Sequence, residues 1–527
     1  MDQALLLVGL FCAIVASAVV ARRFRIPAAI AFVVVGIAIA FIPGLHGLRL
    51  NPQLLFDLVL PPLLFAGGWT TDWQEFKRNL GAISTLAIGL VIFTTVVVAA
   101  IVHALAGFDW AMAFVLGAIV SPPDAVAPEA IFQRLALPRR IASIITGEGL
   151  FNDGVALVLY RFALGAAVAG TFSMASAPLA FVLNVVGGIA CGLVVGILFE
   201  GVLRALTRFS DDATVANVVA LLAPYAAYLP ADAFGVSGVL SAVMAGVYLS
   251  RRSQVVFTAE GRVIADSVWQ VMLLLLNGLV FLQIGLTLPF IYRSIQVGEY
   301  VWIAVIISIA VIVLRLIWVF TVAPLRRMIP GVARRDPLPT WQQLLVLGWS
   351  GMRGIISLAA ALAIPYVDAH GAPLHGRAEI IFITLCVIVV TLLLHGLTLG
   401  PMIAWLGLGE TDKRQGQEMA IRVRALQGGA RYLRSVQNTL KTPGELEAAG
   451  RLLGEYERRI AHLQGHLDEE AAERELDDER EADRRLELGA LDAERHAISS
   501  MRRSGEIPDD IYQDIEYDLD LAGLRLR

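Results

Sequence analysis

Long apolar segments recur along the first three quarters of the chain and are separated by short polar loops. Most are roughly 18 to 28 residues long, close to the ~20 residues that a helix needs to cross about 30 Å of hydrocarbon. A membrane-spanning β-strand would need only about 10 residues. The pattern therefore predicts about 13 membrane-spanning helices. The candidate spans are residues 4–21, 27–42, 53–70, 81–106, 111–133, 140–163, 178–203, 213–229, 235–250, 265–290, 299–324, 341–366 and 378–406.

Basic residues alternate between the loops. One set of loops carries Arg22, Arg23, Arg25, Lys77, Arg78, Arg134, Arg139, Arg140, Arg204, Arg208, Arg251, Arg252, Arg262, Arg326, Arg327, Arg334 and Arg335, and the opposite set carries Arg49, Arg293 and Arg377. Cytoplasmic loops are the ones enriched in Lys and Arg. The alternation therefore predicts an N-terminus outside the membrane and a C-terminal tail inside. Because its basic cluster follows it, the first run is expected to be a retained span and not a cleaved signal.

Composition separates a membrane part from a charged tail. The chain is 57% hydrophobic and 17% charged, and the charge is concentrated beyond Gly409. We therefore expect an all-α polytopic membrane domain at 1–409 and a cytoplasmic helical tail at 410–527. A regulatory or dimer-supporting tail and a merely solvated helical hairpin both stay open. No cofactor, nucleotide or nucleic-acid motif is visible, and the three cysteines have no metal-ligand spacing.

A proline-rich segment interrupts the fifth apolar run. It reads Ser-Pro-Pro-Asp-Ala-Val-Ala-Pro over 121–128 and contains Asp124. Prolines cannot continue a regular helix, and unwound backbone at membrane depth is tolerated only inside protein or beside a watery cavity. Since a charge there costs at least ~2.5 kcal/mol, we interpret Asp124 as functional. A proline kink with Asp124 capping the next half-helix is the alternative, and it is compatible with such a site.

The sixth run carries two acids, Glu148 and Asp153. They are five residues apart and lie on diverging helix faces, so we expect different partners for them. Asp153, flanked by Asn152 and Gly154, offers the oxygen ligands that hard cations prefer. A carboxylate can also take up a proton, so sodium and proton can compete for Asp153, which is sufficient for exchange. The alternative is a buried acid that only accepts hydrogen bonds.

The twelfth run contains Gly-Trp-Ser-Gly-Met-Arg-Gly over 348–354. Glycines at a spacing of three thin one helix face and permit a close crossing with a neighbour. Arg353 cannot lose its proton and needs a carboxylate, for which Glu148 is the natural choice. The alternative is that Arg353 reaches the cytoplasmic surface. Arg315 lies deep in the eleventh run, and its partner is left open.

Four segments resemble the sodium/proton exchanger family of the NhaP type. They are PPLLF at 61–65, SPPDAVAP at 121–128, GEGLFNDG at 147–154 and GMRGIISLAAALAIP at 351–365. The match keeps its order and spans most of residues 1–406. The Asn-Asp pair within a Glu-containing helix is its most specific part, and it resembles the electroneutral branch, in which one sodium exchanges for one proton.

The resemblance implies a fold, an assembly and a set of roles. It implies 13 helices in two inverted repeats, a homodimer in the cell inner membrane, and a core subdomain that moves past a dimerisation subdomain. The interrupted crossing helices would be the fifth and twelfth spans. It also implies that Asp153 binds Na⁺, that Asp124 and the Pro123 carbonyl help, and that Glu148 pairs with Arg353.

Two departures from the family's residue pattern bear on the choice of cation, and three alternatives to sodium/proton exchange stay open. Ala66 and Gly149 stand where the family often has Glu and Ser, so two potential oxygen ligands are lost and Li⁺ or K⁺ stays open beside Na⁺. An ion channel could use the same site. A rhomboid-like intramembrane serine protease is the third alternative, because 348–351 matches a GxSG motif, with Ser350 as nucleophile and His395 as base. That protease would leave the four charged residues of the site unexplained.

Overall fold

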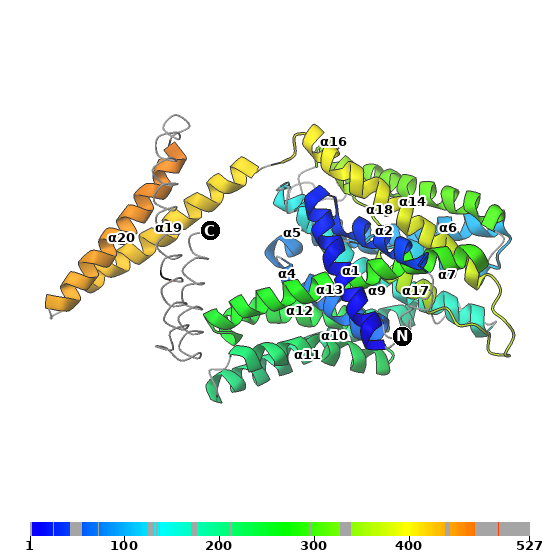
Figure 1. Ribbon diagram of the computed structural model, residues 1–527, viewed down its shortest axis with the longest axis horizontal. Coiled ribbons are helices and arrows are strands. Elements are labelled where there is room, and N and C mark those ends of the chain that lie inside the picture. Colours follow the sequence, from blue (N-terminus) through cyan, green and yellow to red (C-terminus); the bar gives the residue numbers. More distant parts are fainter. Residues whose placement is uncertain are drawn as a thin grey trace. The chain divides into compact units, whose positions relative to one another are not determined.

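A computed structural model of the chain (Figure 1) consists almost entirely of helices in the residues that it describes. These are 3–24, 26–42, 55–71, 73–124, 128, 131–132, 135, 137–169, 177–209, 213–294, 297–326, 339–409, 411–437, 443–468 and 494. Their extended pairing is limited to an isolated bridge between Val367 and Pro373. The predicted basic positions Arg25, Arg49, Arg134, Arg327, Arg334 and Arg335, the segment 125–127 and most of the tail beyond Asp468 lie outside the described residues.

The chain forms two compact units, Met1–Glu410 and Thr411–Arg527. In the second unit, helix α19 (Thr411–Gln437) packs against α20 (Pro443–Asp468). Arg434 donates to Glu457 across the pair at 2.6 Å, and the ring of Tyr456 lies against Gly429. The described part of this unit is therefore a helical hairpin held by charged and apolar contacts.

The first unit is a bundle of apolar helices. Its elements are α1 (Gln3–Phe24), α2 (Ala28–Ala40), η1 (Leu55–Val59), α4 (Leu60–Thr70), α5 (Trp73–Ser84), η2 (Thr85–Leu90), α6 (Val91–Ala106), α7 (Trp110–Val120), α9 (Arg139–Ala169), α10 (Ala177–Phe209), α11 (Ala213–Ala233), α12 (Gly238–Val256), α13 (Ala259–Ser294), α14 (Val297–Leu325), α16 (Trp341–Trp349), α17 (Ile355–Leu362) and α18 (Arg377–Trp405). η1 and η2 are short π-helical segments that lead into α4 and α6.

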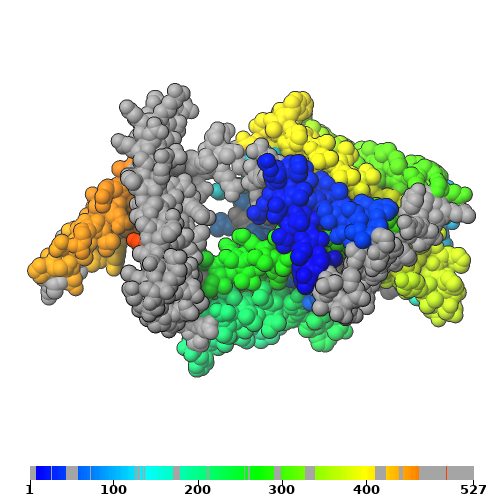
Figure 2. Space-filling view, in the orientation of Figure 1, coloured from blue at the N-terminus to red at the C-terminus, as the bar shows by residue number. Residues whose placement is uncertain are grey.

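The outer surface of this bundle is apolar. Helix α1, blue at the visible surface in Figure 2, exposes Val8, Phe11, Val15 and Val19 at helical spacing. A soluble protein rarely shows so continuous an apolar stripe. Within the described residues, seven helical stretches are long and apolar enough to cross a membrane. They are Trp73–Ala106, Arg139–Ala169, Leu179–Phe209, Ala213–Ala233, Gly261–Pro289, Gly298–Leu325 and Arg377–Trp405. The chain is therefore a multi-pass membrane protein, while the total of 13 crossings and the inverted repeats stay predictions.

The helices pack in two groups. One group contains α4, α10, α11 and α12 together with α1, α2 and α13, and part of its core is a separate apolar cluster around Phe65 and Trp269. Its α2 and α13 cross so closely that a side chain at Gly36 or Gly285 would meet the other backbone. The other group contains α5–α7, α9, α14 and α16–α18. Helix α9 belongs to the second group and contacts α4, α10 and α12 of the first.

Both predicted helix interruptions are present. Helix α7 ends at Val120, and residues 121–124 are not helical. Helix α16 ends at Trp349, residues 350–354 are extended or irregular, and α17 begins at Ile355. Proline removes amide donors in the first segment, and glycines permit the irregular backbone of the second.

Candidate functional site

The two interrupted segments touch through their backbones. The amide of Asp124 donates to the carbonyl of Met352 at 2.7 Å. Gly354 lies so close to the Asp124 carboxylate that any side chain there would collide with it. The unwound backbone groups of one segment are thus partly satisfied by the other segment, as backbone polar groups inside a membrane protein require.

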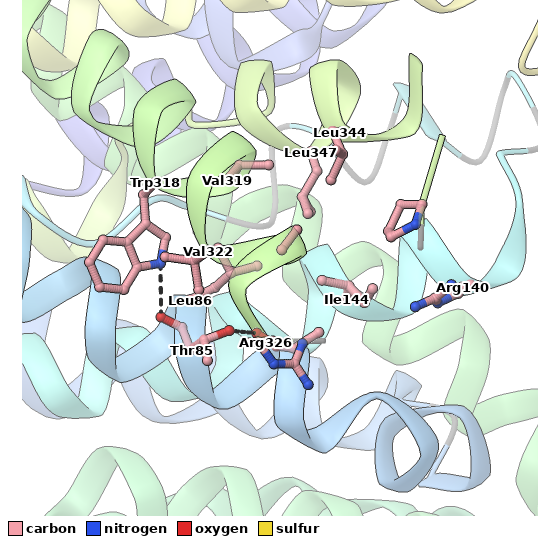
Figure 3. A pocket seen from close by; sticks show the side chains of 13 residues that line it. Thr85, Leu86, Arg140, Ile144, Trp318, Val319, Val322, Arg326, Leu344 and Leu347 are labelled. Carbon is pink, nitrogen blue, oxygen red and sulfur yellow. Dashed lines mark hydrogen bonds between the residues drawn. The ribbon is translucent and has the colours of Figure 1, made fainter. Parts of the chain in front are cut away.

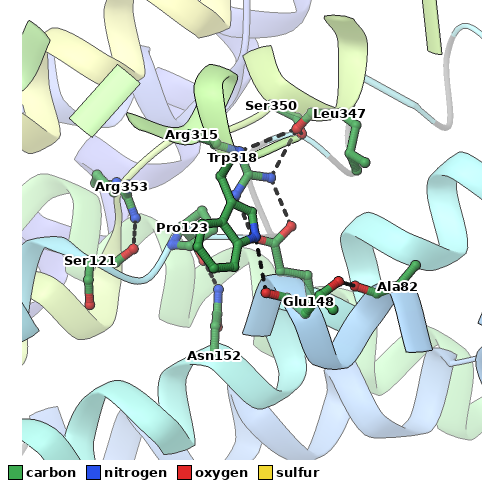
Figure 4. A network of polar contacts seen from close by, with 11 residues as sticks. Ala82, Ser121, Pro123, Glu148, Asn152, Arg315, Trp318, Leu347, Ser350 and Arg353 are labelled. Carbon is green, nitrogen blue, oxygen red and sulfur yellow. Dashed lines mark hydrogen bonds and ion pairs between the residues drawn. The ribbon is translucent and has the colours of Figure 1, made fainter. Parts of the chain in front are cut away.

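Asn152 ties helix α9 to this crossing. Its side-chain amide donates to the Pro123 carbonyl at 2.8 Å, and Asn152 is fully buried (Figure 4). Pro123 precedes Asp124, and Asn152 precedes Asp153, so this one hydrogen bond fixes the register between the two acids. A carbonyl oxygen has two lone pairs, so Pro123 keeps the capacity to bind a cation as well.

Asp124 and Asp153 line the same cavity, whose volume is about 70 Å³. Its wall is mostly apolar, with Leu60, Leu63, Leu64, Gly67, Pro122, Leu150, Ile355 and Ile356, and it includes Gly149 and Gly354. The hydroxyl-bearing residues of the wall are Thr146 and Ser357. The structure therefore brings the two predicted carboxylates together in a small space that is otherwise poor in polar groups.

Glu148 forms a buried ion pair with Arg315, which corrects the predicted pair with Arg353. Arg315 donates from Nη2 to Oε2 of Glu148 at 2.8 Å and from Nη1 to Oε1, and it also donates to the Leu347 carbonyl at 3.0 Å (Figure 4). The acid and the arginine are 1% and 2% exposed. The bidentate geometry is the strongest form of such a pair, and it links α9, α14 and α16.

Arg353 has backbone and hydroxyl partners instead. Its side chain donates to the Ser121 carbonyl, and its amide donates to the Thr391 hydroxyl at 3.1 Å. Because α7 ends just before Ser121, the Ser121 carbonyl is free of helical hydrogen bonds and accepts from Arg353. This acceptor is a backbone group, so side-chain patterns in the sequence could not reveal it. Arg353 is also within electrostatic range of Asp153, and it places a positive charge beside the cavity.

Sequence reasoning missed three features of this region. The role of Arg315 could not be read from spacing, because it lies 167 residues from Glu148 on another helix. Thr146 and Ser357 were detectable: Thr146 lies two helical turns before Asp153, and Ser357 lies three residues after Gly354. Both spacings place side chains on a common helix face.

A second cavity lies between η2, α9, α14 and α16 (Figure 3) and has a volume of about 40 Å³. Trp318 spans its edge and donates to the Thr85 carbonyl at 3.2 Å. Neither Asp124 nor Asp153 reaches this cavity. It therefore contributes nothing to the carboxylate chemistry.

The donor set of the first cavity suits a hard monovalent cation. It contains two carboxylates, two hydroxyls and a nearby carbonyl, which are the oxygen ligands that such ions prefer. In the part of the chain that the structure describes, no group of three or more His, Cys, Asp or Glu side chains gathers as a metal centre.

The serine-protease alternative finds no support in the geometry. The Ser350 hydroxyl donates to the Leu347 carbonyl at 3.0 Å, and His395 packs edge-on against the ring of Trp349. No hydrogen bond joins Ser350 to His395 among the described contacts, and both His395 ring nitrogens lack a hydrogen-bond partner there. A nucleophilic serine needs its base within hydrogen-bond reach.

Interrupted helices that cross beside carboxylates in an apolar bundle define a secondary membrane transporter. The chain belongs to the sodium/hydrogen exchanger family, whose transmembrane profile it matches over residues 8–405. This confirms the family that the sequence motifs indicated.

Two relatives and a solved structure extend the comparison. An uncharacterized Na⁺/H⁺ exchanger of Mycobacterium tuberculosis is 31% identical over 99% of this chain and 95% of its own. A sodium, potassium, lithium and rubidium/H⁺ antiporter of Bacillus pumilus is 32% identical over 86% of this chain and 68% of its own. The sodium proton antiporter MjNhaP1 of Methanocaldococcus jannaschii has the same fold, with a TM-score of 0.60 and 18% identity over 78% of this chain and all of that one.

Proposed function

We propose that this protein exchanges Na⁺ for H⁺ across the cell inner membrane, electroneutrally and by alternating access. The observation that carries the proposal is that Asp124 and Asp153 face one cavity at the crossing of two interrupted helices. Family membership supports the reaction class. Sodium is the first choice of cation, and Li⁺ and K⁺ are the alternatives within the same class, since the Bacillus relative is named for several alkali cations.

Asp153 is the group that cation and proton share. It lines the cavity, whereas Asn152 is not part of the cavity wall and donates its side-chain amide to the Pro123 carbonyl, so Asp153 is the member of the pair that faces the ion. Asp124 and the Pro123 carbonyl supply further oxygen. A cation and a proton that exclude each other from one carboxylate are coupled without any second site, and a carrier needs its empty, unprotonated form to stay immobile.

The cavity lies on one side of Asp153. Its α9 residues Thr146, Gly149 and Leu150 all precede Asp153, toward the helix end that is expected to be cytoplasmic. Beyond Asp153 the side chain of Leu240 on α12 packs directly against Gly154. Under the predicted orientation, with the N-terminus outside and the tail cytoplasmic, this arrangement is the inward-facing state.

Alternating access follows from the two packing groups. We assign the group containing α9, α7, α16 and α17 as the moving core subdomain and the group containing α10–α13 as the dimerisation subdomain, within a transmembrane domain at 1–409. A homodimer embedded in lipid would hold the dimerisation subdomain still while the site in the core subdomain moves past it. The tail at 410–527 is assigned a regulatory role.

Exchange can be measured in proteoliposomes. Vesicles loaded at acidic pH are diluted into Na⁺, K⁺ or Li⁺, and the internal pH is followed, with choline as the ionic-strength control. We expect alkalinisation by Na⁺ at a rate unchanged when valinomycin and equal K⁺ clamp the membrane potential. Absence of a response to every cation would refute the antiporter, and a cation current across a planar bilayer would point to a channel.

A further inference from the structure

We infer that the Ser357 hydroxyl is a ligand of the transported cation and sets the preference among alkali cations. The inference rests on the proposed function and adds a residue to its site. Ser357 belongs to the first turn of α17, directly after the second interrupted segment. It lines the cavity that Asp124 and Asp153 share.

The position of Ser357 follows from the position of Gly354. Residues three apart on a helix lie on one face, about 5–6 Å from each other. Gly354 faces the Asp124 carboxylate so closely that no side chain fits between them. Ser357 is therefore the first side chain on that face of α17, and its hydroxyl is placed to share a cation with Asp124.

The hydroxyl of Ser357 is not engaged by its own helix. Other buried hydroxyls near the crossing donate to local carbonyls: Ser121 to Ala118 at 3.1 Å and Thr391 to Val387 at 2.8 Å. No hydrogen bond of the Ser357 side chain occurs among the described residues, although the residue is only 2% exposed. Thr384, by contrast, also lacks a partner, but its oxygen is buried and the residue does not line this cavity. Ser357 alone of these combines a free hydroxyl with a place in the cavity wall.

A cation bound in this cavity needs a further oxygen ligand, such as the Ser357 hydroxyl. A hard cation that loses its water must regain several oxygen contacts, and two carboxylates with one carbonyl leave the shell incomplete. Gly149 lines the cavity but has no side chain. Thr146 lies seven residues from Asp153, which is about 10 Å along a helix, so it cannot contact the same ion and instead lines the access path. Ser357 is the remaining hydroxyl.

The test uses the purified full-length protein and two readouts, the thermal stabilisation produced by NaCl, LiCl or KCl over choline chloride, and the KM of exchange for each cation. Ligands that bind only the folded state raise its melting temperature with concentration. We expect Ser357→Ala to weaken the apparent Na⁺ affinity about tenfold in both readouts. A change of this size is typical when one polar contact to a charged group is lost. The loss should be larger for Li⁺ than for K⁺, because the smaller cation approaches oxygen ligands more closely.

Two further variants keep the test decisive. Ser357→Cys replaces a hard oxygen by a soft sulfur of similar shape and should lose Na⁺ in the same way. Ser308→Ala is the matched control, since Ser308 is equally buried but donates to Ala304 of its own helix at 2.7 Å, outside the cavity wall. If Ser357→Ala or Ser357→Cys kept wild-type Na⁺ affinity, with or without a lower melting temperature in choline, the assignment of Ser357 as a ligand would be overturned. The proposed exchange function would not be affected. A wild-type protein without cation-driven exchange would overturn the proposed function itself.

Discussion

Glu148 and Asp153 are two acids on the same helix, five residues apart, and the structure treats them in opposite ways. Glu148 accepts hydrogen bonds from both terminal guanidinium nitrogens of Arg315 and does not line the cavity of the site. Asp153 lines the cavity together with Asp124. Glu148 has a positive partner supplied by the protein, and Asp153 is the carboxylate that we propose binds the transported cation or proton.

The difference teaches how an apolar bundle can hold several charges and use only some of them. A buried ion pair is neutral as a unit, so Glu148 and Arg315 can hold α9, α14 and α16 together at the level of the site. A carboxylate beside a cavity must be neutralised by a cation or a proton before it can cross an apolar barrier. Under the proposed function, Glu148 therefore has a structural role and Asp153 takes part in transport.

The largest effect is expected from Asp153→Asn. The amide keeps the size of the side chain but cannot carry a proton or a full negative charge, so exchange should fall to the rate of empty vesicles. Expression, melting temperature and oligomeric state should stay close to wild type. Proteoliposome exchange measures the loss, with wild type as the reference and gel filtration as the folding control. Substantial sodium/proton exchange by this variant would show that Asp153 is not the shared group.

Removing one member of the buried pair should come next and should act on stability. Glu148→Ala or Arg315→Ala leaves an uncompensated buried charge, which costs about 3–5 kcal/mol. Replacing both residues together should recover much of that loss. A thermal-unfolding double-mutant cycle measures the coupling.

The same cycle distinguishes Arg315 from Arg353. Because Arg353 bonds to the Ser121 carbonyl and not to Glu148, the coupling of Glu148 with Arg353 should be much weaker than its coupling with Arg315. A stronger coupling with Arg353 would restore the pairing that the sequence suggested and contradict the geometry.

Gly354→Ala should have an intermediate effect. The added methyl group would collide with the Asp124 carboxylate and push the two interrupted segments apart. Overpacking of this kind typically costs about 1–3 kcal/mol, and the displaced Asp124 should raise the KM for Na⁺. Gly165→Ala is the control, since a methyl group there meets no neighbouring atom. Equal melting temperatures and KM values for the two variants would argue against the close crossing.

The smallest effect is expected from the exposed ion pair between Arg161 on α9 and Asp232 on α11. Its side chains are 46% and 41% exposed, and ion pairs in contact with water contribute about 0–1 kcal/mol. Arg161→Gln should change the melting temperature little and should lose its effect at high salt. A destabilisation as large as that of Arg315→Ala would mean that burial does not govern the difference between the two pairs.

The sequence sufficed for the parts that depend on local patterns. The Pro-Pro-Asp break and the glycine-rich break appear in the structure at 121–124 and 350–354, because prolines and glycines act on their own backbone. The meeting of Asp124 with Asp153 was also expected. The partner of Glu148 could not be predicted, because Arg315 and Arg353 both lie in apolar runs of the sequence, and only the tertiary fold, which brings Arg315 of α14 to Glu148 of α9, decides between them. Ser357 was overlooked because a serine in an apolar run is usually bonded to its own helix.

Proton release on cation binding is the most direct test of the claim that Asp153 serves both ions. Purified protein in a weakly buffered solution is mixed with NaCl or choline chloride over a range of pH, and the pH change is recorded. A cation that binds a protonated carboxylate must displace its proton, so wild type should release up to about one proton per chain with Na⁺ and none with choline, while Asp153→Asn should release none. Sodium binding without proton release by wild type, or undiminished release by Asp153→Asn, would contradict the account.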